Sequence, residues 1–233
     1  MEPLQLGLTQ QSPCSYLTEQ QQRLAFTLAD SPLSPEVYQQ LIDTNFRRSH
    51  QQLYRPWCAA CDGCQSVRID PRQLALSASQ RRVRNKAQKA GWHYKFVTAP
   101  SAPYFALYQA YIGFKHQQST MYPASMDDLN SMLECNWLAV CFLEQYYNNK
   151  LASVTIVDVL PKGLSAVYTF YDPQVSLFSP GKLAIINLAE ITRLENKLWL
   201  YLGYNVDGCE KMDYKANFKP QQRFIQGQWH SFA

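Results

Sequence analysis

The second half of the sequence strictly limits the possible folds, because three strand-like segments are joined by two tight turns and followed by an apolar helix. The strand-like segments span residues 138–144, 151–159 and 164–171, with turns at 147–150 and 161–163. This order predicts an antiparallel meander. Residues 183–191 are apolar on nearly all sides, which predicts a buried helix, and a further strand is expected at 197–202. The expected fold class is therefore α+β.

The composition supports a large core and a water-soluble location. Of the 233 residues, 46% are hydrophobic and 17% are charged, which favours a folded chain over a disordered one. No apolar stretch approaches the roughly 20 residues that cross a bilayer, and residues 1–13 lack an apolar signal-peptide core. We therefore expect a cytoplasmic protein without a membrane partner.

Four cysteines are spaced as metal ligands often are. Cys58, Cys61 and Cys64 recur every third residue, and Cys14 lies far upstream. Thiolates on one tight loop suit a structural zinc or an iron–sulfur centre. This predicts a Cys-rich N-terminal region over residues 1–70. The alternative is that these cysteines only pack as small hydrophobes, as is expected for Cys135 and Cys141, while Cys209 sits apart from the cluster.

Positive charge is concentrated in one segment. Residues 71–126 contain no Asp or Glu, but they contain eight Lys and Arg residues. The densest part predicts a helix that Ser79 caps and Gly91 ends. A solvated helix face normally mixes both signs, so this segment is better explained as a surface for a polyanion such as a nucleic acid.

Several separate motifs occur together, in an order that is typical of one family. They are Tyr54-Arg55-Pro56-Trp57-Cys58, Ser79-Gln80-Arg81-Arg82, residues 157–160, residues 164–173 and residues 201–220. With them the chain resembles the aminoacyl-tRNA–protein transferases, and in particular the bacterial aspartate/glutamate leucyltransferases that are related to eukaryotic arginyltransferases. The resemblance runs from about Cys14 to Trp229.

The resemblance implies a fold and an activity. It implies a GNAT-like acyltransferase core within residues 71–233, and transfer of leucine from Leu-tRNA to proteins that begin with Asp or Glu, as a degradation signal of the N-degron (N-end rule) pathway. The partners would be Leu-tRNA and the acceptor proteins, and transfer from an ester to an amine needs no cofactor.

This chemistry assigns candidate roles to particular side chains. Asp158 is the expected proton acceptor or amine-positioning residue, and Tyr168 and Tyr171 are expected at the acceptor pocket; the alternatives are a strand-end turn for Asp158 and sheet packing for the tyrosines. An acidic acceptor needs a cation to bind its carboxylate, for which Arg68, Arg81 and Lys211 are candidates. The side chains expected to bind tRNA phosphates are Arg82, Arg84, Lys86 and Lys89.

Three alternative functions stay open at this point. The first is an arginyl-tRNA–protein transferase, which would transfer arginine in place of leucine to the same acceptors. A GNAT-type acetyltransferase is the second, although Pro180 removes a backbone donor from the Ser179-Pro180-Gly181-Lys182 loop that would bind coenzyme A. The third is a metal-braced RNA-binding module without catalytic activity.

Overall fold

The protein is built around an eight-stranded mixed sheet. The computed structural model describes residues 4–233, apart from the side chains of Glu210 and Lys211. The strand order is β14-β13-β7-β12-β11-β10-β9-β8. The strands are β7 (Cys64–Ile69), β8 (His93–Val97), β9 (Val140–Tyr147), β10 (Lys150–Val159), β11 (Gly163–Tyr171), β12 (Trp199–Val206), β13 (Gln221–Ile225) and β14 (Gln228–Phe232).

The predicted meander is confirmed. Strands β9, β10 and β11 pair antiparallel in sequence order. Asn148 and Asn149 form the first turn with positive φ angles of 50° and 58°, a conformation that asparagine tolerates better than most residues. The mixed α and β architecture is thus as expected.

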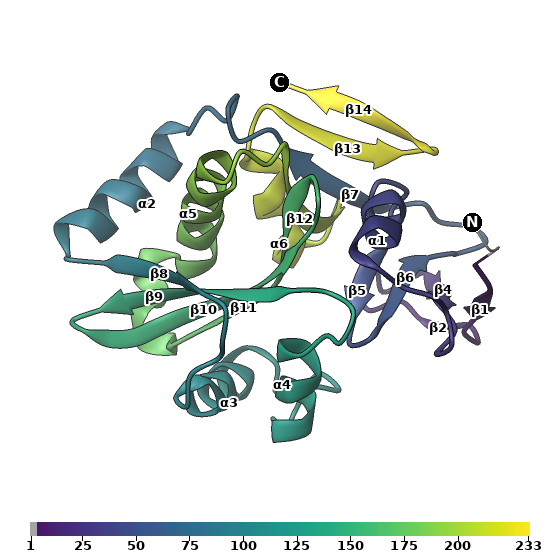
Figure 1. The fold of residues 1–233 in the computed structure, drawn as a ribbon, viewed down its shortest axis with the longest axis horizontal. Helices are drawn as coiled ribbons and strands as arrows, with labels where there is room; N and C mark the ends of the chain where they lie inside the picture. Colours follow the sequence, from purple (N-terminus) through teal and green to yellow (C-terminus); the bar gives the residue numbers. More distant parts are fainter. Residues whose placement is uncertain (1–3) are drawn as a thin grey trace.

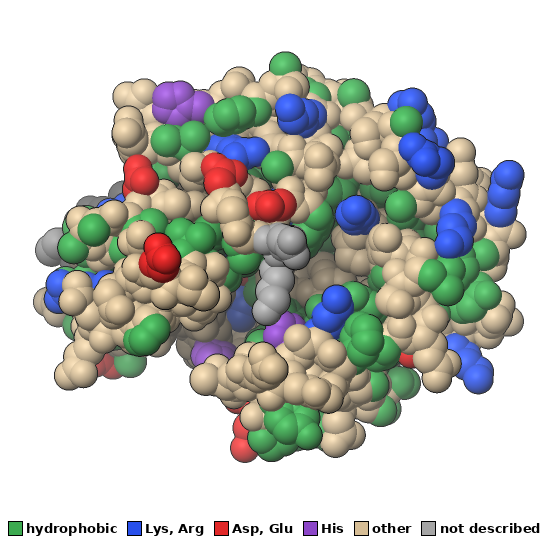
Figure 2. All heavy atoms as spheres, turned by 180° about the vertical axis from the view of Figure 1, so that it is seen from behind, with side chains coloured by type: hydrophobic (Ala, Val, Ile, Leu, Met, Phe, Trp, Pro, Cys, Tyr) green, Lys and Arg blue, Asp and Glu red, His purple; other side chains and the backbone are tan. Residues whose placement is uncertain are grey.

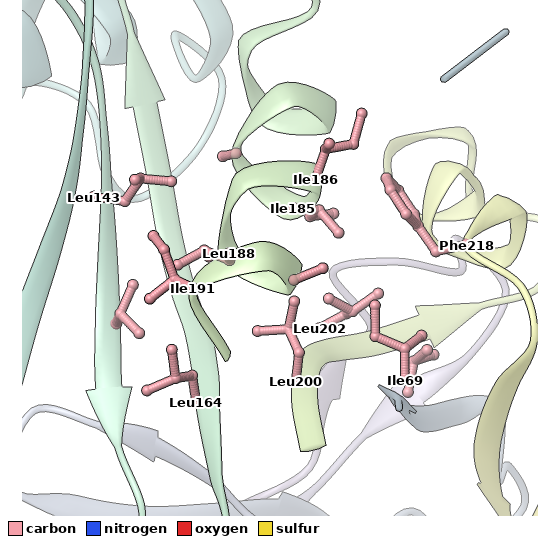
Figure 3. Close-up of a cluster of buried hydrophobic side chains, with 14 residues drawn as sticks. Ile69, Leu143, Leu164, Ile185, Ile186, Leu188, Ile191, Leu200, Leu202 and Phe218 are labelled. Atoms are coloured by element: carbon pink, nitrogen blue, oxygen red, sulfur yellow. The ribbon is translucent and has the colours of Figure 1, made fainter. Parts of the chain in front are cut away.

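Helices cover both faces of this sheet (Figure 1). Strand side chains alternate between the faces, so Leu143 packs against α5 (Pro180–Leu194) while its neighbour Phe142 packs against α3 (Tyr104–Lys115) and α4 (Met126–Leu133). The predicted buried helix is confirmed as α5, which is longer than expected. Figure 3 shows its Leu188 and Ile191 against Leu164 and Leu200 of the sheet.

The densest part of the positive segment forms α2 (Ala78–Lys89), which packs beside α5. Its N-cap is Ser77 and not Ser79: the Ser77 hydroxyl accepts from Gln80 N, and the Gln80 side chain accepts from Ser77 N. This reciprocal capping box satisfies two backbone donors, which a cap at Ser79 would not do. Gly91 has φ of 79° just beyond the helix, as expected for a helix-ending glycine.

The N-terminal part forms a second, smaller sheet. Its order is β1-β4-β6-β5, with a two-stranded sheet β2-β3 beside it and α1 (Pro35–Ile42) packed over it. The strands are β1 (Leu6–Leu8), β2 (Ser12–Pro13), β3 (Gln21–Gln22), β4 (Leu24–Thr27), β5 (Arg47–Ser49) and β6 (Gln52–Pro56). The boundary predicted after residue 70 falls beyond β7, which already pairs with β12 and β13 in the larger sheet.

The segment between β12 and β13 contains two short helical turns. They are α6 (Glu210–Asp213) and η2 (Tyr214–Asn217), and a further 3-10 turn, η1 (Pro173–Phe178), connects β11 to α5. Within residues 4–233, no helix combines the length and the apolar character that spanning a bilayer requires.

Candidate functional site

The two parallel strands at the centre of the large sheet separate after a short contact. β11 and β12 are paired at only three positions, which end at Ser165 and Tyr201. Beyond these residues the strands diverge, and the backbone groups on their inner edges no longer pair with one another. Such groups can bind a side chain or a polar ligand instead. We call the region where the strands diverge the splay site.

A cluster of aromatic side chains lies on the β11 side of the splay site. Tyr111 of α3 contacts both Tyr171 (ring centroids 4.8 Å apart) and Tyr168 (6.2 Å), and His116 lies 5.6 Å from Tyr111. Burial raises the pKa of Tyr168 above its ordinary value, and its hydroxyl donates to Met121 Sδ at 3.8 Å. The structure therefore brings together the two tyrosines that were expected at an acceptor pocket.

The short turn η2 packs against β12 on the other side of the splay site. Its Tyr214 packs against the core that surrounds α5. The next residue, Lys215, donates from Nζ to the Tyr204 carbonyl oxygen of β12 at 2.8 Å. Figure 2 shows the back face of the molecule, which is hollowed near its centre; Lys and Arg side chains lie around the hollow, and Asp or Glu side chains lie at its upper edge.

Asp158 lies at the base of the splay site, but its carboxylate is enclosed. In register it stands beside Ser165 of β11. Its side chain is completely buried, and Oδ1 accepts from Arg48 Nη2 at 2.7 Å and Nε at 2.8 Å. Complete burial raises the pKa of Asp158, and the Arg48 guanidinium opposes this shift. A carboxylate held in this way favours a structural role over direct contact with a substrate amine, and the predicted catalytic role stays untested.

Arg68 is also committed to contacts within the protein. Its guanidinium lies 4.0 Å from the ring centroids of both Trp199 and Trp229, and Nη1 donates to Asp43 Oδ1 at 2.7 Å. Only 12% of the side chain is exposed. These partners leave little of the guanidinium for an acceptor carboxylate. Lys211, a further candidate, has a side chain outside the described part of the chain.

The predicted tRNA-binding residues do share an exposed surface. Arg81, Arg82, Arg84, Lys86 and Lys89 of α2 are all exposed, and Figure 2 shows cations along this side of the molecule. Arg82, Lys86 and Lys89 line a shallow groove with Phe178, and Lys86 Nζ donates to Leu177 O at 3.1 Å. Since η1 leads directly into α5, the basic surface reaches the α5 N-terminus.

The four N-terminal cysteines line one cavity of about 930 Å³ between the small sheet and the end of β12. Burial, together with the nearby thiols of Cys14, Cys58, Cys61 and Cys209, raises the pKa of the Cys64 thiol to about 12. Cys209 is therefore close to this cluster, and the expectation that it sits apart was wrong.

The cysteines as placed do not fit a bound metal. In the part of the chain that the structure describes, no three Cys, His, Asp or Glu side chains come together closely enough to hold a metal ion. We therefore assign no step to a zinc or iron–sulfur centre.

Four residues of this region were not expected from the sequence. Arg47 and Arg48 belong to none of the patterns that the sequence offered, yet both are buried, with 6% and 4% exposed. Tyr111 had no assigned role, and Lys215 lies in the family motif at residues 201–220 without a role of its own.

Two family models match the chain, and together they cover most of it. The model described as "Arginine-tRNA-protein transferase, N terminus" matches residues 12–82, and the model for the C terminus of the same family matches residues 103–225. The chain is similar over its whole length to curated proteins named aspartate/glutamate leucyltransferase. Identity is 39% to that of Aeromonas hydrophila (97% of this chain, 94% of the relative), 38% to that of Vibrio parahaemolyticus (98% and 97%) and 36% to that of Pseudoalteromonas atlantica (97% and 96%).

Solved structures of much lower identity share the fold. The C-terminal domain of a putative lysylphosphatidylglycerol synthetase from Agrobacterium fabrum superposes with a TM-score of 0.54 at 11% identity, covering 85% of this chain and 64% of that one. L-PGS from Bacillus licheniformis superposes with a TM-score of 0.52 at 10% identity, covering 72% and 58%.

Proposed function

We propose, from the premise that this chain belongs to the arginine-tRNA–protein transferase family, that it is an aspartate/glutamate leucyltransferase. It moves leucine from Leu-tRNA to the N-terminal α-amine of proteins that begin with Asp or Glu. The product carries the degradation signal of the N-degron pathway. The curated relatives that are similar over nearly the entire chain support leucine as the donor.

The observation that carries the proposal is the continuity between the basic surface and the splay site. Exposed cations on α2 supply a surface for the tRNA phosphates. From there η1 leads past Lys86 and Phe178 to the start of α5, which lies against β11 and β12. A tRNA acceptor stem bound on α2 would thus extend its 3′ end toward the tyrosine cluster.

The chemistry needs positioning more than activation. The acceptor amine attacks the ester carbonyl, the C–N bond forms, the ester C–O bond breaks, and the 3′-terminal ribose of the tRNA leaves with its hydroxyl restored. Holding the amine against the ester supplies much of the acceleration. The Tyr168 phenol is suited to donate a hydrogen bond to the carbonyl oxygen as negative charge develops there.

We also infer a GNAT-like arrangement for residues 71–233. The antiparallel meander, the diverging parallel strands β11 and β12, and the buried helix between them support this. The α5 N-terminus is a poor coenzyme A site, because Ser179 has a left-handed φ of 53° and Pro180 follows it without an N–H. This favours an aminoacyl-tRNA donor over acetyl coenzyme A.

Arginine is the second candidate donor, because the matching family models describe arginine-tRNA–protein transferases. One assay separates the candidates. Purified protein is mixed with radiolabelled Leu-tRNA, Arg-tRNA or acetyl coenzyme A, and with peptides that start with Asp, Glu or Ala. We expect label on the Asp and Glu peptides from Leu-tRNA alone. Transfer from Arg-tRNA in place of Leu-tRNA would show that arginine is the transferred amino acid. Absence of transfer from every donor would overturn the proposed function.

A further inference from the structure

Two buried or partly buried cations meet at the splay site from distant parts of the sequence. Arg47 comes from β5 of the small sheet, and its guanidinium lies 5.8 Å from the Tyr201 ring centroid and 5.3 Å from that of Tyr204. Lys215 comes from η2 and donates to the Tyr204 carbonyl oxygen. The two charges are close enough that Arg47 lowers the pKa of Lys215, which burial already lowers, to about 8.

Neither cation has an acidic partner among the carboxylates whose side chains the structure describes. Arg47 Nη1 donates to the carbonyl oxygens of Ile42 and Phe46, but Nε and Nη2 are shielded from solvent and have no hydrogen-bond partner. Burying one unpaired charge is costly, and placing a second of the same sign beside it adds repulsion. A site of this kind is completed by an anion that binds there.

The location decides which anion is suitable. Lys215 Nζ bonds the Tyr204 carbonyl oxygen of β12, beyond Tyr201, the last β12 residue that pairs with β11. Lys215 therefore lies where the two strands have separated, which is where the proposed reaction brings the ester and the acceptor amine together. As a whole residue Lys215 is partly exposed, whereas Arg47 is buried, so Lys215 is the more accessible of the two.

We infer that Lys215, backed by Arg47, binds the side-chain carboxylate of the acceptor's first residue and so determines the preference for Asp and Glu. This rests on the proposed function for the identity of the acceptor, and it replaces Arg68 and Arg81 in that role. Arg68 is held between two tryptophans and Asp43. Arg81 lies on the outer surface of α2 and donates to Leu76 O.

The first test measures leucyl transfer to matched peptides that start with Asp or with its uncharged isostere Asn. In Lys215→Met, the ratio of kcat/KM for Asp over Asn should fall at least ten-fold, mainly through a higher KM for the Asp peptide. Lys215→Arg should retain most of the ratio, and Arg47→Gln should lower it. Lys219→Met, which removes an exposed cation four residues away, should leave it unchanged.

A second measurement distinguishes the carboxylate from a tRNA phosphate as the bound anion. Leu-tRNA affinity should be the same in Lys215→Met as in the unsubstituted protein. An unchanged Asp-to-Asn ratio in Lys215→Met, or a loss confined to tRNA affinity, would overturn the inference.

A binding experiment makes the inference independent of catalysis. The lysine side-chain NMR signal that disappears in Lys215→Met is titrated with pH, with and without peptide. A peptide starting with Asp should raise the pKa of Lys215 because a carboxylate stabilises the ammonium, and the Asn peptide should not. This result would support the carboxylate site even if leucyl transfer were absent, whereas equal responses to both peptides would overturn the site even if transfer occurred.

Discussion

Lys215 is held in surroundings that oppose its charge. Burial and the neighbouring Arg47 lower its pKa from 10.5 to about 8, while Cys209 is the one neighbour that acts in the opposite direction. The hydrogen bond from Nζ to Tyr204 O keeps the side chain in place despite this cost. A cation retained at a cost in stability is typical of a binding residue.

This pKa shift predicts a pH-dependent difference in stability between the unsubstituted protein and Lys215→Met. Below pH 8, Lys215 is protonated in both the folded and the unfolded chain, so the difference is constant. Between pH 8 and 10.5 the folded chain loses this proton first, and the unsubstituted protein gains up to about 3 kcal/mol relative to the variant. Urea unfolding at several pH values measures the difference, and a flat profile from pH 7 to 10 would contradict it.

At the scale of the element, α2 combines an N-terminus whose backbone donors are capped with a surface whose charged side chains are all positive. Its capping box and its contact with α5 hold the helix in place, and its first turn contains no acidic residue. The exposed cations therefore repel one another without local compensation. Such a surface is stabilised when a polyanion binds.

Reversing two of these charges tests the tRNA surface. The double variant Arg81→Glu and Arg82→Glu should weaken Leu-tRNA binding by at least ten-fold at low salt, and should make binding less dependent on salt because fewer counterions are released. Lys162→Glu, in the exposed turn before β11, is the matched control and should bind normally. Filter binding across a salt series measures the affinity and its dependence on salt concentration. An unaltered salt dependence in the double variant would show that α2 is not part of the tRNA-binding surface.

The contact between β11 and β12 depends on Gly163. A Cβ at this position would lie 2.5 Å from the Trp199 carbonyl oxygen, which is backbone and has little freedom to move. Gly163→Ala should therefore destabilise the protein by roughly 2 kcal/mol, as overpacking in a core does, and should impair transfer through the splay site. Thermal unfolding together with the transfer assay would check this. An unchanged melting temperature would contradict it, because it would show that β11 and β12 can move apart to accommodate the Cβ without loss of stability.

In the whole molecule, polar contacts join the small sheet to the large one. Arg48 of β5 reaches Asp158 of β10, Asp43 after α1 reaches Arg68 of β7, and Gln39 donates to the Tyr201 hydroxyl at 3.0 Å. Tyr38, Ile42 and Leu53 pack with Leu160 and Tyr201 in the same interface. The N-terminal region thus forms one wall of the splay site.

Asp158→Asn tests whether this interface is a structural unit. The substitution leaves Arg48 charged and buried without its carboxylate partner, which should lower the free energy of unfolding by about 3 kcal/mol. If the interface is one structural unit, the protein should still unfold in a single cooperative transition, at a lower temperature. The turnover of the folded fraction should change little if Asp158 is structural. A large loss of kcat with unchanged stability would instead support the catalytic role predicted from the sequence.

Local patterns in the sequence determined the meander, the buried helix, the basic helix and the family. Period-two alternation, turn residues and an uninterrupted apolar helix depend only on neighbours along the chain, so they can be recognised without a structure. The cationic surface of α2 followed from the same patterns, and the expectation that Tyr168 and Tyr171 lie in one region followed from the resemblance.

Tertiary structure alone decided which charged residues are free to bind a substrate. Arg68 and Asp158 looked available, but Trp199, Trp229 and Arg48 engage them from positions far away in the sequence. Arg47 and Lys215 are 168 positions apart in the sequence numbering, and the fold brings both to Tyr204, Arg47 to its ring and Lys215 to its carbonyl oxygen. Burial and partner choice are set by contacts distant in sequence, and these determine the pKa and the accessibility of a charge.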